Sequence, residues 1–61
     1  MPNLSSKELN ALSDQLDFER VLHCKYLEAV QECQDQELKQ KFQCCADQHK
    51  QNYTTLLNHL R

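Results

Sequence analysis

The chain has 61 residues, of which 39% are hydrophobic and 26% charged, and its formal net charge is −2. This length allows one small domain, and the absence of glycine together with a single proline, Pro2, argues against a turn-rich β fold. The seven Lys and Arg residues are scattered, and no apolar run approaches the roughly 20 residues of a membrane span. We therefore expect neither a nucleic acid nor a membrane as a partner.

The cysteines are interpreted through the compartment in which the chain is made. Residues Met1 to Ser6 lack the basic and apolar regions of a secretion signal, so we expect a cytoplasmic protein at synthesis. Thiols stay reduced there, and the four cysteines include no Cys-x-x-Cys pair. Adjacent Cys44 and Cys45 would point about 100° apart on a helix, which disfavours a shared tetrahedral metal site. The sequence therefore favours free thiols.

The first helix is predicted to begin at about residue 6 and to end at about residue 33. Ser5 and Glu8 have the spacing of a capping box, in which each side chain bonds to the backbone N–H of the other residue. A heptad-like seam follows, with spacings that alternate between three and four residues. It consists of Leu9, Leu12, Leu16, Glu19, His23, Tyr26, Val30 and Cys33.

A turn at about residues 34–36 and a second helix at about 36–59 are predicted next. Asp35 is a favourable N-cap residue, and Glu37 suits the positive end of a helix. The second stripe consists of Leu38, Phe42, Cys45, His49, Asn52, Leu56 and His59, with Tyr53 and Leu60 on its flank. So short a turn forces an antiparallel helical hairpin, and the predicted domain spans 1–61.

Each stripe is interrupted at its centre by polar residues. The predicted turn places residue i roughly opposite residue 71−i, within about one helical turn. His23 then faces His49, and Glu19 faces Asn52. The two polar interruptions are therefore predicted to form one layer between the helices.

A two-helix hairpin of this length buries little apolar surface against its conformational entropy. We therefore expect a homodimer of hairpins, which forms a four-helix bundle. The residues predicted to line the interfaces of this assembly are Leu9, Leu12, Leu16, Tyr26, Val30, Leu38, Phe42, Cys45, Tyr53, Leu56 and Leu60.

Two interpretations of the polar layer remain open. Glu19, His23, His49 and Asn52 could form a hydrogen-bonded layer that sets register and partner, as a core Asn does in coiled coils. Carboxylate and imidazole groups are also ligands for iron, manganese or zinc, so the same four residues are the candidate metal ligands. No cofactor is firmly predicted. The sequence contains no nucleophile–base arrangement and no Gly-rich phosphate loop, so a non-enzymatic protein is expected.

Several of these residues resemble one half of a ferritin-like bundle of the rubrerythrin type. Glu19 and Tyr26 match a Glu with a Tyr seven residues later on the first helix, and Phe42 and Ala46 match the start of the second-helix pattern. His49 and Asn52 stand where that family has Glu-x-x-His, so the signature of its di-iron site is absent.

The closer resemblance is to small spore coat protein F-like relatives of that superfamily. It lies in Leu4 to Leu9, in the Lys25-Tyr26 pair, in Gln34 to Lys39 and in His49 to Leu57. This resemblance implies a ferritin-like hairpin with a role in the spore coat, where other coat proteins would be neighbours. Self-assembly is the leading hypothesis; a variant metal-binding protein and a small regulatory adaptor that accepts a partner helix are the alternatives.

Overall fold

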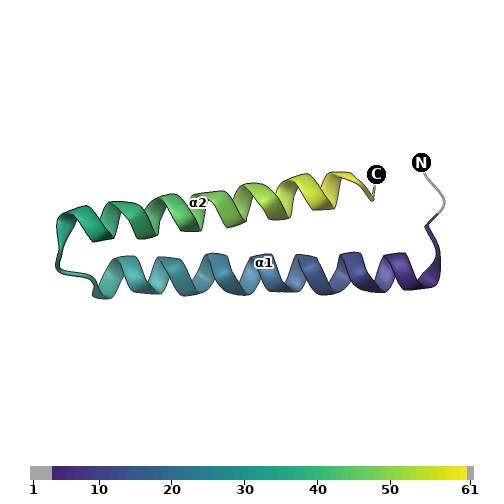
Figure 1. Ribbon diagram of the computed structural model, residues 1–61, viewed down its shortest axis with the longest axis horizontal. Helices are drawn as coiled ribbons and strands as arrows, with labels where there is room; N and C mark the ends of the chain where they lie inside the picture. The colour runs from purple at the N-terminus through teal and green to yellow at the C-terminus, as the bar shows by residue number, and fades with distance from the viewer. Residues whose placement is uncertain (1–3, 61) are drawn as a thin grey trace.

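The chain folds as an antiparallel hairpin of two helices. The computed structural model describes residues 4–60, so residues 1–3 and 61 of the predicted domain lie outside the described part. Helix α1 (Ser6–Glu32) and helix α2 (Gln36–Asn58) are joined by residues 33–35 and lie side by side along their length (Figure 1). The predicted all-α hairpin is confirmed. Neither helix contains an apolar stretch of the length that a bilayer crossing requires.

Helix α1 begins with the capping box that the sequence predicts. The Ser5 hydroxyl accepts a hydrogen bond from the Glu8 backbone N–H at 3.1 Å, and the Glu8 carboxylate accepts one from the Ser5 N–H at 3.0 Å. The bond from the Ser5 backbone holds the pKa of Glu8 below its ordinary value, and the Ser5 hydroxyl contributes in the same direction. Two backbone donors at the helix start are thus satisfied locally.

The turn is made without glycine. Cys33 has an extended backbone, which ends α1, while its N–H still donates to the Ala29 carbonyl at 2.9 Å. The Asp35 carboxylate then accepts from the Leu38 N–H at 2.9 Å and caps α2. No residue of the described chain has a positive φ, so this connection does not require the conformational freedom of glycine.

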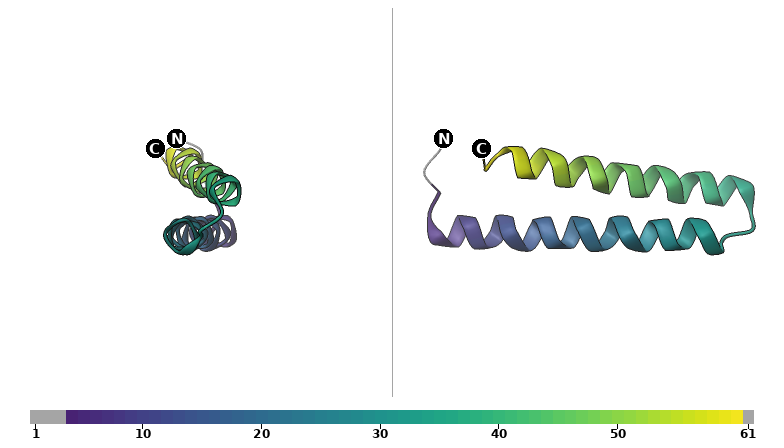
Figure 2. Two further views of the ribbon diagram at one scale, coloured as in Figure 1. Left: turned by 90° about the vertical axis from the view of Figure 1, so that its left-hand side faces the viewer. Right: turned by 180° about the vertical axis from the view of Figure 1, so that it is seen from behind.

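The two helices form a single layer that leaves much apolar surface uncovered. The molecule measures 46 × 15 × 10 Å, and the end-on view in Figure 2 shows one helix above the other with no further element beside them in the described chain. Ala46 is the only apolar side chain in the described residues that is buried; Phe18, for comparison, is 57% exposed. The interior of the hairpin is therefore a narrow seam.

Two leucines that the sequence placed in the stripes do not fill this seam. Leu9 and Leu38 are exposed in the hairpin, whereas Lys39 is half-buried. Ala46 is the most closely packed residue of α2 and therefore defines the side of the helix that faces α1. Lys39 lies two turns before Ala46 on that same side, whereas Leu38 is rotated by about 100° from Lys39. The rotation of α2 thus differs slightly from the one the stripe suggested.

Candidate functional site

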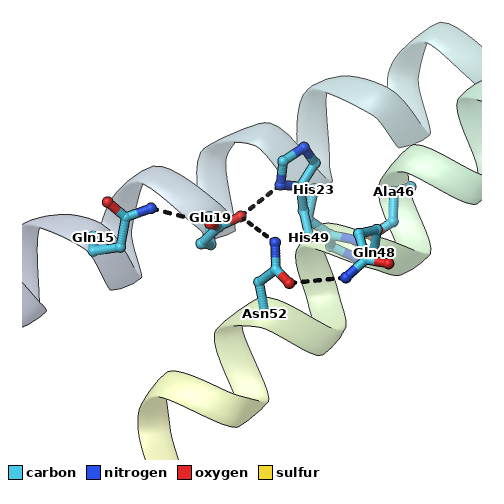
Figure 3. Close-up of polar contacts among 7 residues, drawn as sticks. All are labelled: Gln15, Glu19, His23, Ala46, Gln48, His49 and Asn52. Carbon is cyan, nitrogen blue, oxygen red and sulfur yellow. Dashed lines mark hydrogen bonds and ion pairs between the residues drawn. The ribbon is translucent and has the colours of Figure 1, made fainter.

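The centre of the hairpin is organised around the carboxylate of Glu19. This side chain comes from the middle of α1 and is 7% exposed. Its Oε2 atom accepts a hydrogen bond from Gln15 Nε2 at 3.0 Å, and its Oε1 atom accepts bonds from His49 Nδ1 at 2.5 Å and from Asn52 Nδ2 at 3.4 Å (Figure 3). Both oxygens of the buried carboxylate are therefore satisfied.

These contacts keep the carboxylate ionised. The hydrogen bond from His49 is the largest cause that holds the pKa of Glu19 below its ordinary value, although burial acts in the opposite direction. The bonds from Gln15 and Asn52 also lower this pKa. An ionised carboxylate only accepts hydrogen bonds, so the Nδ1 atom of His49 must carry the proton in this contact.

The donors around Glu19 are themselves held in place. The Tyr26 ring stacks on the His49 imidazole, with ring centroids 5.5 Å apart and an interplanar angle of 11°. Gln48 Nε2 donates to Asn52 Oδ1 at 2.9 Å, which leaves the Nδ2 group of Asn52 directed at Glu19 (Figure 3). Orientation of the donors by further contacts makes the pairing between the helices specific in register.

His23 takes a different partner from the other three predicted site residues. Its Nδ1 atom lies 2.7 Å from the backbone oxygen of Ala46. A carbonyl oxygen can only accept, so the Nδ1–H of His23 donates to it. Of the four candidate residues, Glu19, His49 and Asn52 thus meet in one network, and His23 anchors the adjacent turn to the backbone of α2.

The observed pairing differs from the residue-by-residue correspondence expected from the turn. His49 was expected opposite His23 but bonds to Glu19, about one turn nearer the start of α1. The Glu19–Asn52 pair is formed as expected, at a longer distance. The difference lies within the one-turn tolerance of the prediction. It arises because the long Glu19 side chain accepts a short bond from His49 in addition to the bond from Asn52, the residue expected opposite it.

Sequence reasoning missed the supporting amides. Gln15 lies four residues before Glu19, and Gln48 lies four residues before Asn52. This spacing places side chains together on a helix face, so it was a usable signal. The bond between His23 and the Ala46 carbonyl has no comparable signal, because any residue carries a backbone oxygen.

The arrangement fits a structural network better than a metal centre within one chain. A metal site requires several lone pairs that converge on one point. Around Glu19, N–H donors converge instead and occupy both carboxylate oxygens. In residues 4–60 no three His, Cys, Asp or Glu side chains are placed to hold a metal ion, and no buried side-chain polar atom lacks a hydrogen-bond partner.

Comparison with protein families, with curated proteins and with solved structures finds no match to this chain. The resemblance to spore coat protein F-like chains therefore stays a prediction that rests on the motifs in the sequence. The geometry of the site favours the fixing of one helix against another.

Proposed function

We propose that this chain is a non-enzymatic assembly protein whose functional unit is a two-fold dimer of hairpins, packed as a four-helix bundle. The observation that supports this proposal most strongly is the large solvent-accessible surface area of the hairpin. The hairpin exposes 4919 Å², which is about 800 Å² more than the roughly 4,100 Å² expected of a compact monomer of its mass. A standard protein interface buries about 800 Å² on each partner, so the excess exposed by one hairpin is as large as the area that one such interface covers.

The Glu19 network supports this proposal by supplying register. Apolar side chains on two smooth helices can pack in several nearly equivalent registers, whereas a buried carboxylate with two directed donors on the opposite helix is satisfied in only one. The hairpin would thus present the same apolar surface in every copy. A uniform surface is what symmetric self-association requires.

The sequence resemblance adds a cellular setting to the proposal. A spore coat protein F-like role would place the assembly in the spore coat, with other coat proteins as neighbours. The support for this setting is the set of matching motifs, from Leu4 to Leu9 and from His49 to Leu57. Detection of the protein in the coat fraction of purified spores, and its absence from the spore core, is the expected result.

The decisive experiment for self-assembly is a mass measurement across concentration. Light scattering coupled to gel filtration is expected to give about twice 7.2 kDa, and the melting temperature is expected to rise over an approximately hundredfold increase in protein concentration. A cooperatively folded monomer with a melting temperature independent of concentration would contradict the proposal. A monomer that folds only with a partner's helix would instead indicate the adaptor role.

A metal-binding role predicts different results from the proposed assembly role, so metal analysis can distinguish the two. Protein purified without an affinity tag is expected to contain no stoichiometric iron, manganese or zinc, and addition of these ions is expected to leave the melting temperature unchanged. The variant His49→Ala should lower the melting temperature equally with and without metal, because it removes the main donor to Glu19. Bound metal that is lost in His49→Ala would favour the metal-binding role.

A further inference from the structure

The hairpin has two open faces, and they differ in chemistry. One hollow is lined by Gln15, Glu19, Asn52, Thr55 and Leu56. A second hollow is lined by Arg20, His23, Lys50 and Tyr53. Both hollows lie at the level of the polar centre, but they open on different sides of the hairpin.

Helix geometry places the two hollows on opposite sides. Successive helix residues are about 100° apart, so Arg20 lies about 100° to one side of Glu19 and Gln15 about 40° to the other. On α2, Lys50 lies about 40° to one side of Ala46 and Asn52 about 120° to the other. We call the side with Arg20, His23, Lys50 and Tyr53 the basic face. The neutral face is defined by Gln15, Leu22, Ala29, Cys45, Asn52 and Leu56.

In a two-fold dimer the face that forms the interface packs against the same face of the second copy. The two faces can therefore be compared by asking how well each packs against itself. The exposed leucines Leu9 and Leu27 lie toward the ends of the basic face. At the centre of this face, the cations Arg20 and Lys50 would meet their own copies and lose solvent, and so would Asp17, which lies 3.8 Å from Arg20. Charged residues are depleted at the centre of protein interfaces for this reason. The basic face is therefore a poor contact for a second copy.

The centre of the neutral face lacks this conflict, because its two lysines, Lys25 and Lys41, lie at the outer edges of the face, about 120° from Glu19 and 140° from Ala46. Gln15 and Asn52 carry amides, which both donate and accept and can therefore pair with an identical group. Leu22, Ala29 and Leu56 supply apolar surface around them. The charge of Glu19, at the bottom of the hollow, is already bound by three donors within its own chain.

We propose that the second copy docks on the neutral face, with the two-fold axis close to the hollow beside Glu19. This inference rests on the proposed self-assembly and names the surface that carries it. The partner's Gln15 and Asn52 would close over the Glu19 carboxylate and exclude water from it, while the basic face stays open to solvent.

The reactivity of the native cysteines can report which face is covered in the dimer. Cys45 is half-buried on the neutral face, whereas Cys24 and Cys44 are exposed on the outer surfaces of α1 and α2. With single-cysteine variants, the alkylation rate of Cys45 is expected to fall at least about tenfold on passing from dilute to dimeric protein. The rates of Cys24 and Cys44 should stay unchanged, and circular dichroism at both concentrations separates docking from folding.

A matched pair of charge substitutions gives a second, independent test. Gln15 and Gln43 are both exposed, and each donates at 3.0 Å to an acidic residue four positions later, Glu19 and Asp47 respectively. Gln15 lies on the neutral face, and Gln43 lies on the same side of α2 as Lys50. The variant Gln15→Lys is expected to weaken dimerisation by at least about tenfold, and Gln43→Lys to leave it within about twofold.

The outcomes distinguish the two levels of the proposal. A monomer at every concentration would overturn both self-assembly and the docking face. A dimer in which Cys45 reacts as fast as it does in the folded monomer, or in which Gln43→Lys is the disruptive variant, would overturn the neutral face alone. A dimer with protected Cys45 and a selective effect of Gln15→Lys supports the assignment.

Discussion

The polar centre of the hairpin and the apolar segments on either side of it solve different problems. At the centre, the buried carboxylate of Glu19 finds all of its hydrogen-bond partners within one chain. On either side, Leu16, Leu56 and Phe42 remain only partly covered by the opposite helix. Directional bonds can be completed by two helices, whereas burial of a broad apolar face needs more neighbours. The centre therefore specifies the hairpin, and the partly covered flanks support the proposed assembly.

The largest expected effect comes from placing a charge in an apolar flank. The substitution Leu56→Asp, on the neutral face, would bury an unpaired carboxylate in the assembled bundle, which costs about 3 kcal/mol or more. We expect loss of the dimer, measured as a halved mass in light scattering and a lower midpoint in urea.

The control for this change is Ser13→Asp, which adds the same charge to an exposed position of α1. It should leave the mass and the urea midpoint nearly unchanged, because surface substitutions usually alter stability by about 0.5 kcal/mol or less. Equal effects of the two substitutions would show that the flank does not carry the assembly.

The next largest effect is expected from removal of the central acceptor. Glu19→Ala leaves the donors of Gln15, His49 and Asn52 without their shared partner, so the melting temperature should fall clearly. Glu19→Gln keeps one acceptor oxygen of the same shape and should lie between the wild type and Glu19→Ala. A melting temperature for Glu19→Ala equal to that of the wild type would show that the central network does not stabilise the fold.

Acid should weaken the centre before it weakens the flanks. The pKa of Glu19 is lower in the folded chain than in the unfolded chain, chiefly because of the bond from His49. The stability that this carboxylate contributes is present above the unfolded pKa, about 4.3, and is lost as the pH falls through the folded pKa. The melting temperature is therefore expected to drop below about pH 4.3.

Two variants can show which carboxylate causes this loss of stability in acid. Glu8 in the capping box also has a lowered pKa and contributes in the same direction. Glu19→Gln should reduce the loss of stability in acid more than Glu8→Gln, since Glu19 is buried and Glu8 is exposed. The same acid response in Glu19→Gln as in the wild type would indicate that other carboxylates control it.

The smallest expected effect lies at the turn. Asp35→Ala removes the acceptor for the Leu38 N–H and should cost about 1 kcal/mol of unfolding free energy, measured by urea denaturation. Asp35→Asn keeps a side-chain oxygen at the same position and should cost much less. A larger loss from Asp35→Ala than from Glu19→Ala would reverse the comparison between the turn and the polar centre.

Local signals in the sequence were enough to predict the hairpin. The capping boundary at Ser5 and Glu8, the N-cap at Asp35 and the alternating three- and four-residue spacing of the stripes all act within a few residues. Because hydrogen bonds at helix ends and the repeat of a helix are short-range properties, they depend little on what lies elsewhere in the chain. The coincidence of the two polar interruptions followed from the turn position alone.

The tertiary structure decided what the local signals left open. In the folded chain Glu19 accepts a hydrogen bond from His49, and His23 donates to the Ala46 carbonyl. Lys39 rather than Leu38 lies toward α1. These choices depend on the rotation and offset of one helix against the other by less than one turn, and on how far each side chain reaches. Such quantities are set by packing at Ala46 and by the competition of donors for one carboxylate, which a periodic pattern does not encode.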